Sequence, residues 1–300
     1  MGKKAPGTLM IAGMVVSWTA YYAASKMTVA ATGSAFLAGL LLRAAAFVFL
    51  TAQLIAEKKL RDIFRQGRVA YILLLIGCLG FLLDTFANLG YSHGSLSTGT
   101  ALLKTDVLMA NLATVVIYKK KLYSSDWAGT IIMLAGVLMV LGVDFSGFTL
   151  NWYDLFFIAS ALCVTVNAFI IKAAQDKFKA DTEMISYYNN FMVLLLFFIS
   201  SLATGAFRAP LGAGGAGFWW IVVIGGLAQT LIYFFYYRNL KCYEVWMVKL
   251  YLLLMPVLSC ALGVAFLNER LTAEKTIGIA VVLLGAAVIL LRDRINKVEV

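Results

Sequence analysis

The sequence predicts an all-α membrane protein with ten transmembrane helices, arranged as two inverted five-helix repeats with both termini in the cytoplasm. The composition is the first indication: 62% of the 300 residues are hydrophobic and 13% are charged. Soluble domains are roughly one-quarter charged, so this charged fraction is low. The mean hydropathy of the chain is +0.88. The other two indications are ten apolar runs of membrane-spanning length and an internal repeat.

The apolar runs are counted against the length of a membrane span. A helix needs roughly 20 apolar residues to cross about 30 Å of hydrocarbon. The predicted spans are residues 8–27, 34–56, 69–91, 97–118, 127–143, 153–174, 184–205, 217–237, 244–267 and 272–292. Short polar or glycine-rich joints separate them, such as "EKKLRDIFRQGR" from Glu57 to Arg68.

The basic residues predict the orientation. With the N-terminus in the cytoplasm, 18 of the 25 Lys and Arg residues fall in inner joints and tails and four fall in outer joints. This bias follows the positive-inside rule. Nine or eleven spans would leave one basic end outside. The net charge of +10 is therefore explained by the basic residues that set the orientation in the membrane. A nucleic-acid partner is not predicted.

Two stretches of the sequence have a similar pattern. "LYSSDWAGTIIMLAG" is followed 149 positions later by "LTAEKTIGIAVVLLG". This shift superposes Gly129 on Gly278 and Gly136 on Gly285, with an apolar run between each pair.

A second correspondence extends the repeat to the start of each half. A shift of 146 positions places "SWTAYYAASK", which ends at Lys26, over "CVTVNAFIIK", which ends at Lys172. The predicted halves are residues 1–146 and 147–300. Five spans per half is an odd number, so the second copy is inverted in the bilayer, a plan common among secondary transporters.

The end of the second half carries a family resemblance. "MPVLSCALGVAFLNERLTAEKTIGIAVVLLGAAVIL", from Met255 to Leu290, contains Pro, then Glu-Arg-Leu, then two glycines. This pattern is similar to the end of each repeat in the EamA-type permeases of the drug/metabolite transporter superfamily. "LLR" ending at Arg43 resembles the second-helix arginine of that family, and Trp18 with Lys26 resembles its first-helix signature.

The first half departs from this pattern at two places. Val107 stands where Pro256 predicts proline, and Lys120 stands where Glu269 predicts glutamate. The resemblance implies a ten-span transporter fold. It leaves the cargo open, because the superfamily handles amino acids, nucleotide sugars, phosphorylated sugars, cations and drugs.

Five charged residues lie inside predicted spans: Arg43, Asp84, Lys104, Asp106 and Lys249. A charge at mid-bilayer costs at least about 2.5 kcal/mol, so such residues normally face a partner or a wet cavity. Three are bases and two are acids, and the surplus predicts an anionic or zwitterionic cargo.

Lys249, Lys104 and Arg43 are candidate cargo contacts that would supply positive charge. Lys104 and Asp106 are two positions apart and do not share a helix face, so each needs a partner elsewhere. Lys249 precedes Pro256, the predicted kink of the ninth helix. We expect Lys249 to contact an anionic group; the alternative is a lysine that snorkels to the inner interface. The triose-phosphate and nucleotide-sugar branches of the resembling superfamily also have a lysine in this helix.

Aromatic and amide residues form a second group of candidates. Tyr187, Asn189 and Asn190 belong to "SYYNN", which is similar to the Tyr-Asn-Asn of nucleotide-sugar transporters. Gln229 and Tyr233 share a helix face. Such a lining would suit a flat or amphipathic solute, while the alternative is interfacial tyrosines with asparagines that join helices. The candidates of this group are Tyr187, Asn189, Asn190, Gln229, Tyr233, Tyr21 and Asn167.

Asp84 is the candidate proton carrier. If it is desolvated, its carboxyl group could hold a proton during exchange. Pairing with Arg43 in a purely structural role is the alternative.

The predicted function is secondary active transport of a small polar metabolite by alternating access. One histidine, no phosphate loop and no metal spacing argue against an enzyme, a cofactor or a metal site. The predicted location is the inner (plasma) membrane of a bacterium or archaeon, with a proton or counter-substrate as coupling partner and the lipid bilayer as surroundings. The alternatives are an exporter of amino acids or hydrophobic drugs and cations, and a lipid-phosphate flippase.

Overall fold

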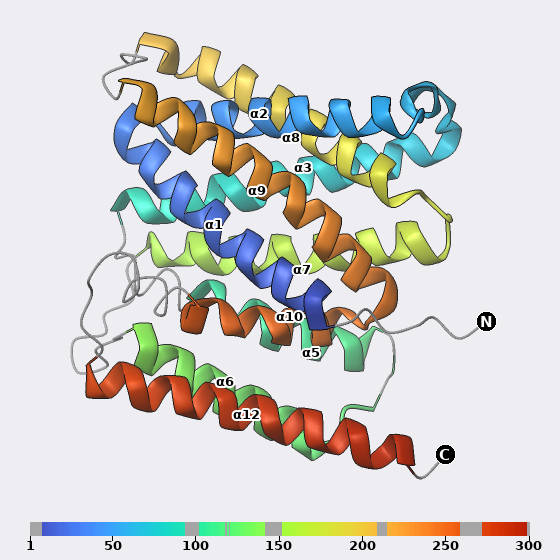
Figure 1. Cartoon of the computed structure of the whole chain (residues 1–300), viewed down its shortest axis with the longest axis vertical. Helices are drawn as coiled ribbons and strands as arrows, with labels where there is room; N and C mark the ends of the chain where they lie inside the picture. Colours follow the sequence, from blue (N-terminus) through green and yellow to red (C-terminus); the bar gives the residue numbers. More distant parts are fainter. Residues whose placement is uncertain are drawn as a thin grey trace. The chain divides into compact units, whose positions relative to one another are not determined.

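The computed structural model describes residues 8–93, 102–117, 119, 121–141, 152–208, 215–258 and 272–298, and this part of the chain consists of helices joined by short turns, without strands (Figure 1). The all-α prediction is therefore confirmed for these residues. The helices are α1 Thr8–Thr32, α2 Ala35–Ala56, η1 Leu60–Arg65, η2 Gly67–Val69, α3 Ala70–His93, α5 Asp106–Val116, α6 Ser124–Leu141, α7 Asp154–Asp176, α8 Thr182–Ala203, η3 Ala206–Arg208, α9 Gly215–Cys242, α10 Val245–Tyr251, η4 Leu252–Leu254 and α12 Ala273–Val298.

Five stretches of the described helices are long and apolar enough to cross a membrane. They are Ala35–Ala56, Ala70–Ala87, Leu155–Asp176, Thr182–Ala203 and Gly217–Cys242. The count of ten crossings and the cytoplasmic placement of both termini stay predictions.

The turn between α1 and α2 follows from its residue types. Gly33 takes a φ of +64°, a left-handed conformation that suits a residue without a side chain. Ser34 caps α2 by accepting a hydrogen bond from the amide of Leu37 at 3.3 Å. The two helices are therefore joined by only two residues.

The chain packs as two units, and the division falls inside α3 and α7. Unit 1 comprises Met1–Leu89 and Val166–Glu244, and unit 2 comprises Gly90–Thr165 and Val245–Val300. Each unit takes helices from both predicted repeats, so the packing units and the repeats are different divisions. The repeat boundary at residues 146 and 147 stays a prediction.

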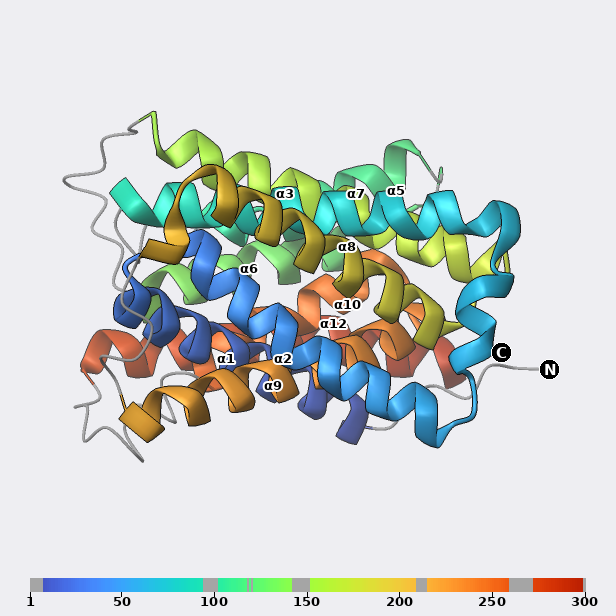
Figure 2. The same cartoon turned by 90° about the horizontal axis from the view of Figure 1, so that it is seen from above.

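Unit 1 is held together by glycines that let helices approach. A Cβ on Gly225 would lie 2.4 Å from Leu42 of α2, and one on Gly77 of α3 would lie 2.4 Å from Met192 of α8. Figure 1 and Figure 2 show α1 running beside α9, where Gly13 leaves room for the ring of Phe235. At these positions glycine lets neighbouring helices pack closely.

Unit 2 contains the helix pair α6 and α12, which carry the two similar stretches and lie side by side (Figure 1). Gly136 faces Gly278, and Gly285 faces Gly129. Residue numbers rise along one helix as they fall along the other, so the helices are antiparallel. Two copies of one segment that pack antiparallel are what an inverted repeat requires.

Candidate functional site

Arg43 of α2 is the centre of a buried polar cluster in unit 1. Its Nη2 donates to Oδ2 of Asp84 in α3 at 2.6 Å, and its Nη1 donates to the Tyr233 hydroxyl of α9 at 2.6 Å. The guanidinium carbon lies 5.6 Å from the centroid of the Tyr21 ring, within reach of a cation–π interaction. Charge-assisted hydrogen bonds and aromatic rings thus offset the burial of this cation.

Asparagine side chains extend the cluster to α8. Asn190 donates through Nδ2 to the backbone oxygen of Arg43 at 3.0 Å. Asn189 donates to the Tyr237 hydroxyl, and the Tyr237 ring lies 5.3 Å from that of Tyr233. The predicted residues Arg43, Asn189, Asn190 and Tyr233 are therefore brought together by contacts inside one unit.

Several polar atoms of unit 1, in this cluster and at Asn167, keep unused hydrogen-bonding capacity. Within the described part of the chain, Nε of Arg43 and Oδ1 of Asn189, Asn190 and Asn167 are buried without a hydrogen-bond partner. A buried polar group without a partner costs free energy, so these atoms could receive a polar solute or water.

The remaining aromatic and amide candidates are placed less uniformly. Gln229, Tyr21 and Asn167 are buried in unit 1. Tyr187 is half-buried and packs against Phe47 in a tilted arrangement, with 5.1 Å between ring centroids. Tyr187 therefore packs as an aromatic neighbour, and its predicted contact with cargo stays a prediction.

Lys249 of α10 and Asp106 of α5 form a buried ion pair in unit 2. The distance from Nζ of Lys249 to Oδ2 of Asp106 is 2.9 Å, and the lysine side chain is 1% exposed. The alternative that Lys249 snorkels to an interface is wrong for this structure, because the side chain is enclosed and paired. Of the two kinds of partner expected for Asp106, another helix or the cargo, the structure supplies another helix.

Lys104 lies close to this pair but has no carboxylate partner among the described residues. Its Nζ contacts Sδ of Met255 at 3.7 Å, and thioether sulfur is a weak acceptor. Asp106 and Lys249 both act on it electrostatically. Of the five charged residues, four form the pairs Arg43–Asp84 and Lys249–Asp106, and Lys104 carries the surplus positive charge.

The helices that carry Lys104 and Lys249 are interrupted at equivalent places. The predicted unbroken span 97–118 turns at Lys104 and Thr105, where the amide of Val107 bonds to the oxygen of Lys104 at 3.3 Å. In the second half, α10 gives way to the 3₁₀ turn η4, Leu252–Leu254. The repeat shift of 149 positions maps residues 104 and 105 onto 253 and 254.

Proline accounts for only one of the two interruptions. Pro256 has no amide hydrogen to donate to the oxygen of Leu252, so an α-helical bond is missing where η4 lies. Val107, at the equivalent place in the first half, has its amide, yet that helix turns as well. No residue type explains the first turn, and the kink of the ninth helix at Pro256 stays a prediction.

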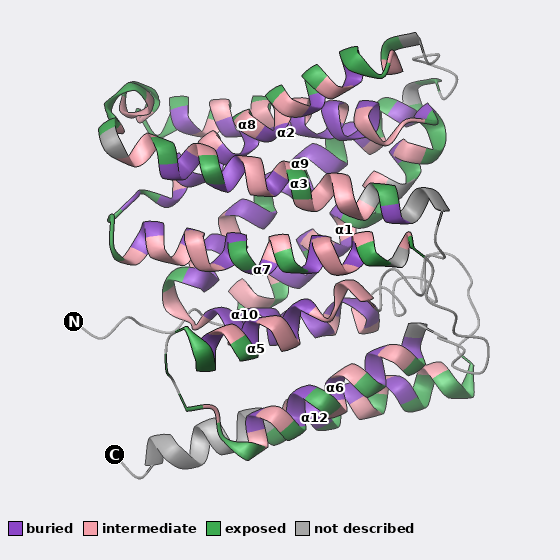
Figure 3. Ribbon diagram, turned by 180° about the vertical axis from the view of Figure 1, so that it is seen from behind, coloured by how far each residue is buried: buried purple, intermediate pink, exposed green. Residues whose placement is uncertain are grey.

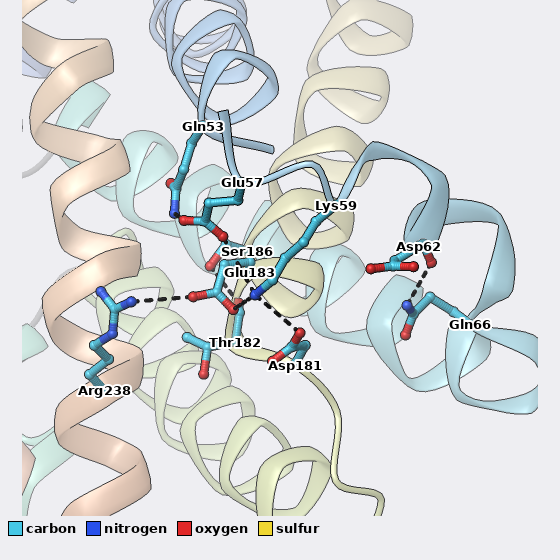
Figure 4. A network of polar contacts seen from close by, with 10 residues as sticks. All are labelled: Gln53, Glu57, Lys59, Asp62, Gln66, Asp181, Thr182, Glu183, Ser186 and Arg238. Carbon is cyan, nitrogen blue, oxygen red and sulfur yellow. Dashed lines mark hydrogen bonds and ion pairs between the residues drawn. The ribbon is translucent and has the colours of Figure 1, made fainter. Parts of the chain in front are cut away.

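A charged network at one end of unit 1 was not anticipated. Lys59 lies within 3.5 Å of carboxylate oxygens of Glu57, Asp181 and Glu183, and Arg238 reaches Glu183 at 3.3 Å (Figure 4). The signal in the sequence was weak, because these residues stand in joints and helix ends where charges are ordinary.

A small recess adjoins this network. Its cavity volume is about 10 Å³, close to the minimum for one water molecule. The residues that line it are Leu50, Gln53, Thr182, Glu183, Ser186, Thr230, Tyr233, Phe234 and Arg238. It is too small for a metabolite. Among the described residues, no group of three or more His, Cys, Asp or Glu side chains could hold a metal ion.

The long apolar helices and the buried charges fit a multi-pass integral membrane protein. The sequence pattern of the EamA-like transporter family matches the chain twice, over residues 5–142 and 151–291, and the chain belongs to this family. Members of the family are membrane transporters of the drug/metabolite type. The two matched segments correspond to the two predicted repeats.

A solved structure titled "Crystal structure of protein" is similar to this chain with a TM-score of 0.74 and 19% sequence identity, and the alignment covers 94% of this chain and 98% of that one. At this identity the likeness shows a shared fold. No curated protein matches the chain at the significance threshold.

Proposed function

We propose that the chain is a secondary active transporter that moves a small polar metabolite, leaning anionic or zwitterionic, by alternating access. Membership of the EamA-like family supports transport. The interrupted helices at Lys104 and η4 support a cargo site in this region, because discontinuous helices commonly form the substrate sites of secondary transporters.

The single observation that carries the anionic leaning is the position of Lys104. The other four charged residues neutralise each other in two ion pairs at 2.6 Å and 2.9 Å. The Lys104 ammonium group has only the weak Met255 contact within the described part of the chain. A carboxylate or phosphate of the cargo would supply its missing partner.

Taken by itself, the polar cluster of unit 1 is a second candidate cargo site, which would recognise shape. In the proposal, the buried Asn189, Asn190, Gln229 and Tyr233 offer directed hydrogen bonds, and Tyr21 offers an aromatic face. Asp84 would carry the coupling proton. When Asp84 is neutral, Arg43 loses its carboxylate partner and becomes available to an anion.

A second candidate function is supported by the same ion pairs. If Arg43–Asp84 and Lys249–Asp106 only hold helices together, the cargo needs no anionic group. The chain would then export amino acids, hydrophobic drugs or cations. Lys104 would in that case be dispensable for binding.

A thermal-shift screen of the purified protein decides between the two functions. A ligand that binds only the folded state raises the melting temperature with its concentration. We expect phosphorylated or carboxylated metabolites to stabilise the wild type, Lys104→Arg to keep most of this effect and Lys104→Gln to lose it. Stabilisation by amino acids or cationic drugs, equal in wild type and Lys104→Gln, would support the exporter instead.

The matched control for these variants is Lys121→Gln. Lys121 is also in unit 2 and is exposed, so its replacement removes the same charge without touching the buried cluster. We expect it to respond to ligands as the wild type does. Flux of the stabilising compound into proteoliposomes then establishes that binding leads to transport.

A further inference from the structure

The segment Glu57 to Arg68 links two helices that can cross a membrane, α2 and α3. It therefore lies where the chain leaves the hydrocarbon and meets the lipid headgroups. The segment contains five basic and two acidic residues. It folds as the 3₁₀ helices η1 and η2 rather than as an irregular loop.

One side of the segment is fastened to the protein. Lys59 turns toward Asp181 and Glu183 at the start of α8, each at 3.4 Å, as Figure 4 shows. The hydroxyl of Tyr188 in α8 donates to the backbone oxygen of Ile63 at 2.6 Å. These contacts hold η1 in a fixed orientation and engage Lys59 within the protein.

The other side of the segment is exposed. Lys58, Leu60, Arg61, Phe64 and Arg65 are all exposed, and Phe64 is 89% exposed. Figure 3 shows η1 in the intermediate and exposed colours, and no residue of η1 is buried. Because side chains three apart align in a 3₁₀ helix, Arg61 and Phe64 project in the same direction.

An exposed aromatic ring beside cations matches the boundary of an anionic membrane. Aromatic rings are favoured at the level of the headgroups, and basic side chains near a bilayer attract anionic lipids. Arg65 has a weak ion pair with Asp62 at 3.8 Å, with side chains 75% and 45% exposed, so its guanidinium group remains accessible to a phosphate.

We propose that residues 58–65, which include η1, form a binding site for anionic phospholipid headgroups, in which Lys58, Arg61 and Arg65 contact the phosphate and headgroup oxygens and Phe64 inserts at the acyl boundary. The occupant is a lipid of the surrounding bilayer. A soluble phosphate would pair with the cations but would leave Phe64 exposed. The Phe64 ring therefore favours a lipid over a soluble phosphate.

The test titrates full-length protein in mixed micelles with phosphatidylglycerol or with phosphatidylcholine of the same acyl chains. The measurement is the apparent lipid affinity from the rise in melting temperature. We expect phosphatidylglycerol to bind more tightly than phosphatidylcholine. Arg61→Gln/Arg65→Gln should weaken phosphatidylglycerol binding on the order of 25-fold, about five-fold for each cation removed.

Two further variants separate this site from general attraction between charges. Phe64→Ser keeps every charge, and we expect it to weaken binding of both lipids. Lys119→Gln/Lys121→Gln removes two exposed charges from another joint and should leave the preference for phosphatidylglycerol unchanged. The melting temperature of each variant in phosphatidylcholine reports its folding, and Arg61→Lys/Arg65→Lys should retain the preference.

Three outcomes would overturn the proposal. The first is a full preference for phosphatidylglycerol in Arg61→Gln/Arg65→Gln while that variant folds. The second is an equal loss in the Lys119→Gln/Lys121→Gln control. The third is stabilisation of the wild type by inorganic phosphate to the same extent as by the lipid.

Discussion

Gly136 of α6 and Gly278 of α12 lie backbone against backbone. A Cβ built on Gly136 would be 2.8 Å from the oxygen of Gly278, and one built on Gly278 would be 2.9 Å from the oxygen of Gly136. The shift of 149 positions maps Gly136 onto Gly285 and Gly129 onto Gly278. Gly129 and Gly285 are also in contact. The repeated glycines are therefore explained by one antiparallel helix crossing with local two-fold symmetry.

Replacing Gly136 tests how strongly this crossing is packed. Gly136→Ala places a methyl group 2.6 Å from the backbone nitrogen of Val282, so α6 and α12 must separate. We expect a loss of about 1–3 kcal/mol in the free energy of unfolding, measured by the melting temperature and by denaturant titration. Gly217→Ala in α9 is the control, because nothing lies within 4 Å of its Cβ position. Equal stability of both variants would contradict the packing argument.

The ion pair Lys249–Asp106 predicts that Lys249→Met destabilises the protein. The substitution leaves the Asp106 carboxylate without its cation, and breaking one side of a buried pair costs about 3–5 kcal/mol. The double variant Lys249→Met/Asp106→Asn should recover most of the lost melting temperature, because neither charge then remains. Lys121→Met, an exposed lysine of the same unit, should have little effect.

Transport data would show whether this pair also serves the cargo. If the recovered double variant transports as the wild type does, Lys249 has a structural role only. If it folds but no longer binds an anionic ligand, Lys249 contributes to cargo recognition as the sequence predicted.

Asp84→Asn tests the proposed coupling proton. Asparagine can still accept a hydrogen bond from Arg43 but does not titrate. We expect flux in proteoliposomes to continue and to lose its dependence on an imposed pH gradient. Asp62→Asn, in the η1 turn, should keep the dependence of the wild type. A wild type insensitive to the gradient, or an unchanged response in Asp84→Asn, would remove Asp84 from the coupling mechanism.

The helical fold was readable from the sequence because apolar run length is a local property. The repeat was readable because Gly129, Gly136, Gly278 and Gly285 recur at one fixed shift. Five internal charges were also evident, and their surplus of one positive charge could be counted. A charged side chain inside a membrane span costs free energy, so each such residue is easily recognised within an apolar run.

The pairing of those charges could not be read in advance. The sequence favoured Lys249 as the cation for the cargo, but Asp106, 143 positions away, neutralises it, and Lys104 carries the surplus. The turn at Lys104 was also missed, since Val107 gives no signal comparable to Pro256. Which charged side chains form an ion pair depends on how close their helices lie in space, and the order of residues in the sequence does not give these distances.

Lys59 predicts a pH dependence of stability that is confined to alkaline conditions. Partial burial opposes the charge on Lys59, but Glu183 and Asp181 outweigh it, and the pKa of Lys59 is raised above its ordinary value of 10.5. The folded state therefore holds this proton more tightly than the unfolded state does. Its contribution to stability is fully present below pH 10.5 and declines as the pH rises through the folded pKa.

Melting curves of wild type and Lys59→Met across neutral and alkaline pH measure this contribution. The side chain is 32% exposed, so we expect a difference of only about 0.5 kcal/mol at neutral pH. The difference should stay constant below pH 10.5 and shrink above it. Lys58→Met, a neighbouring lysine that is exposed, should show a smaller difference. A difference that grows with rising pH would mean that the carboxylates of Asp181 and Glu183 do not stabilise the folded state through Lys59.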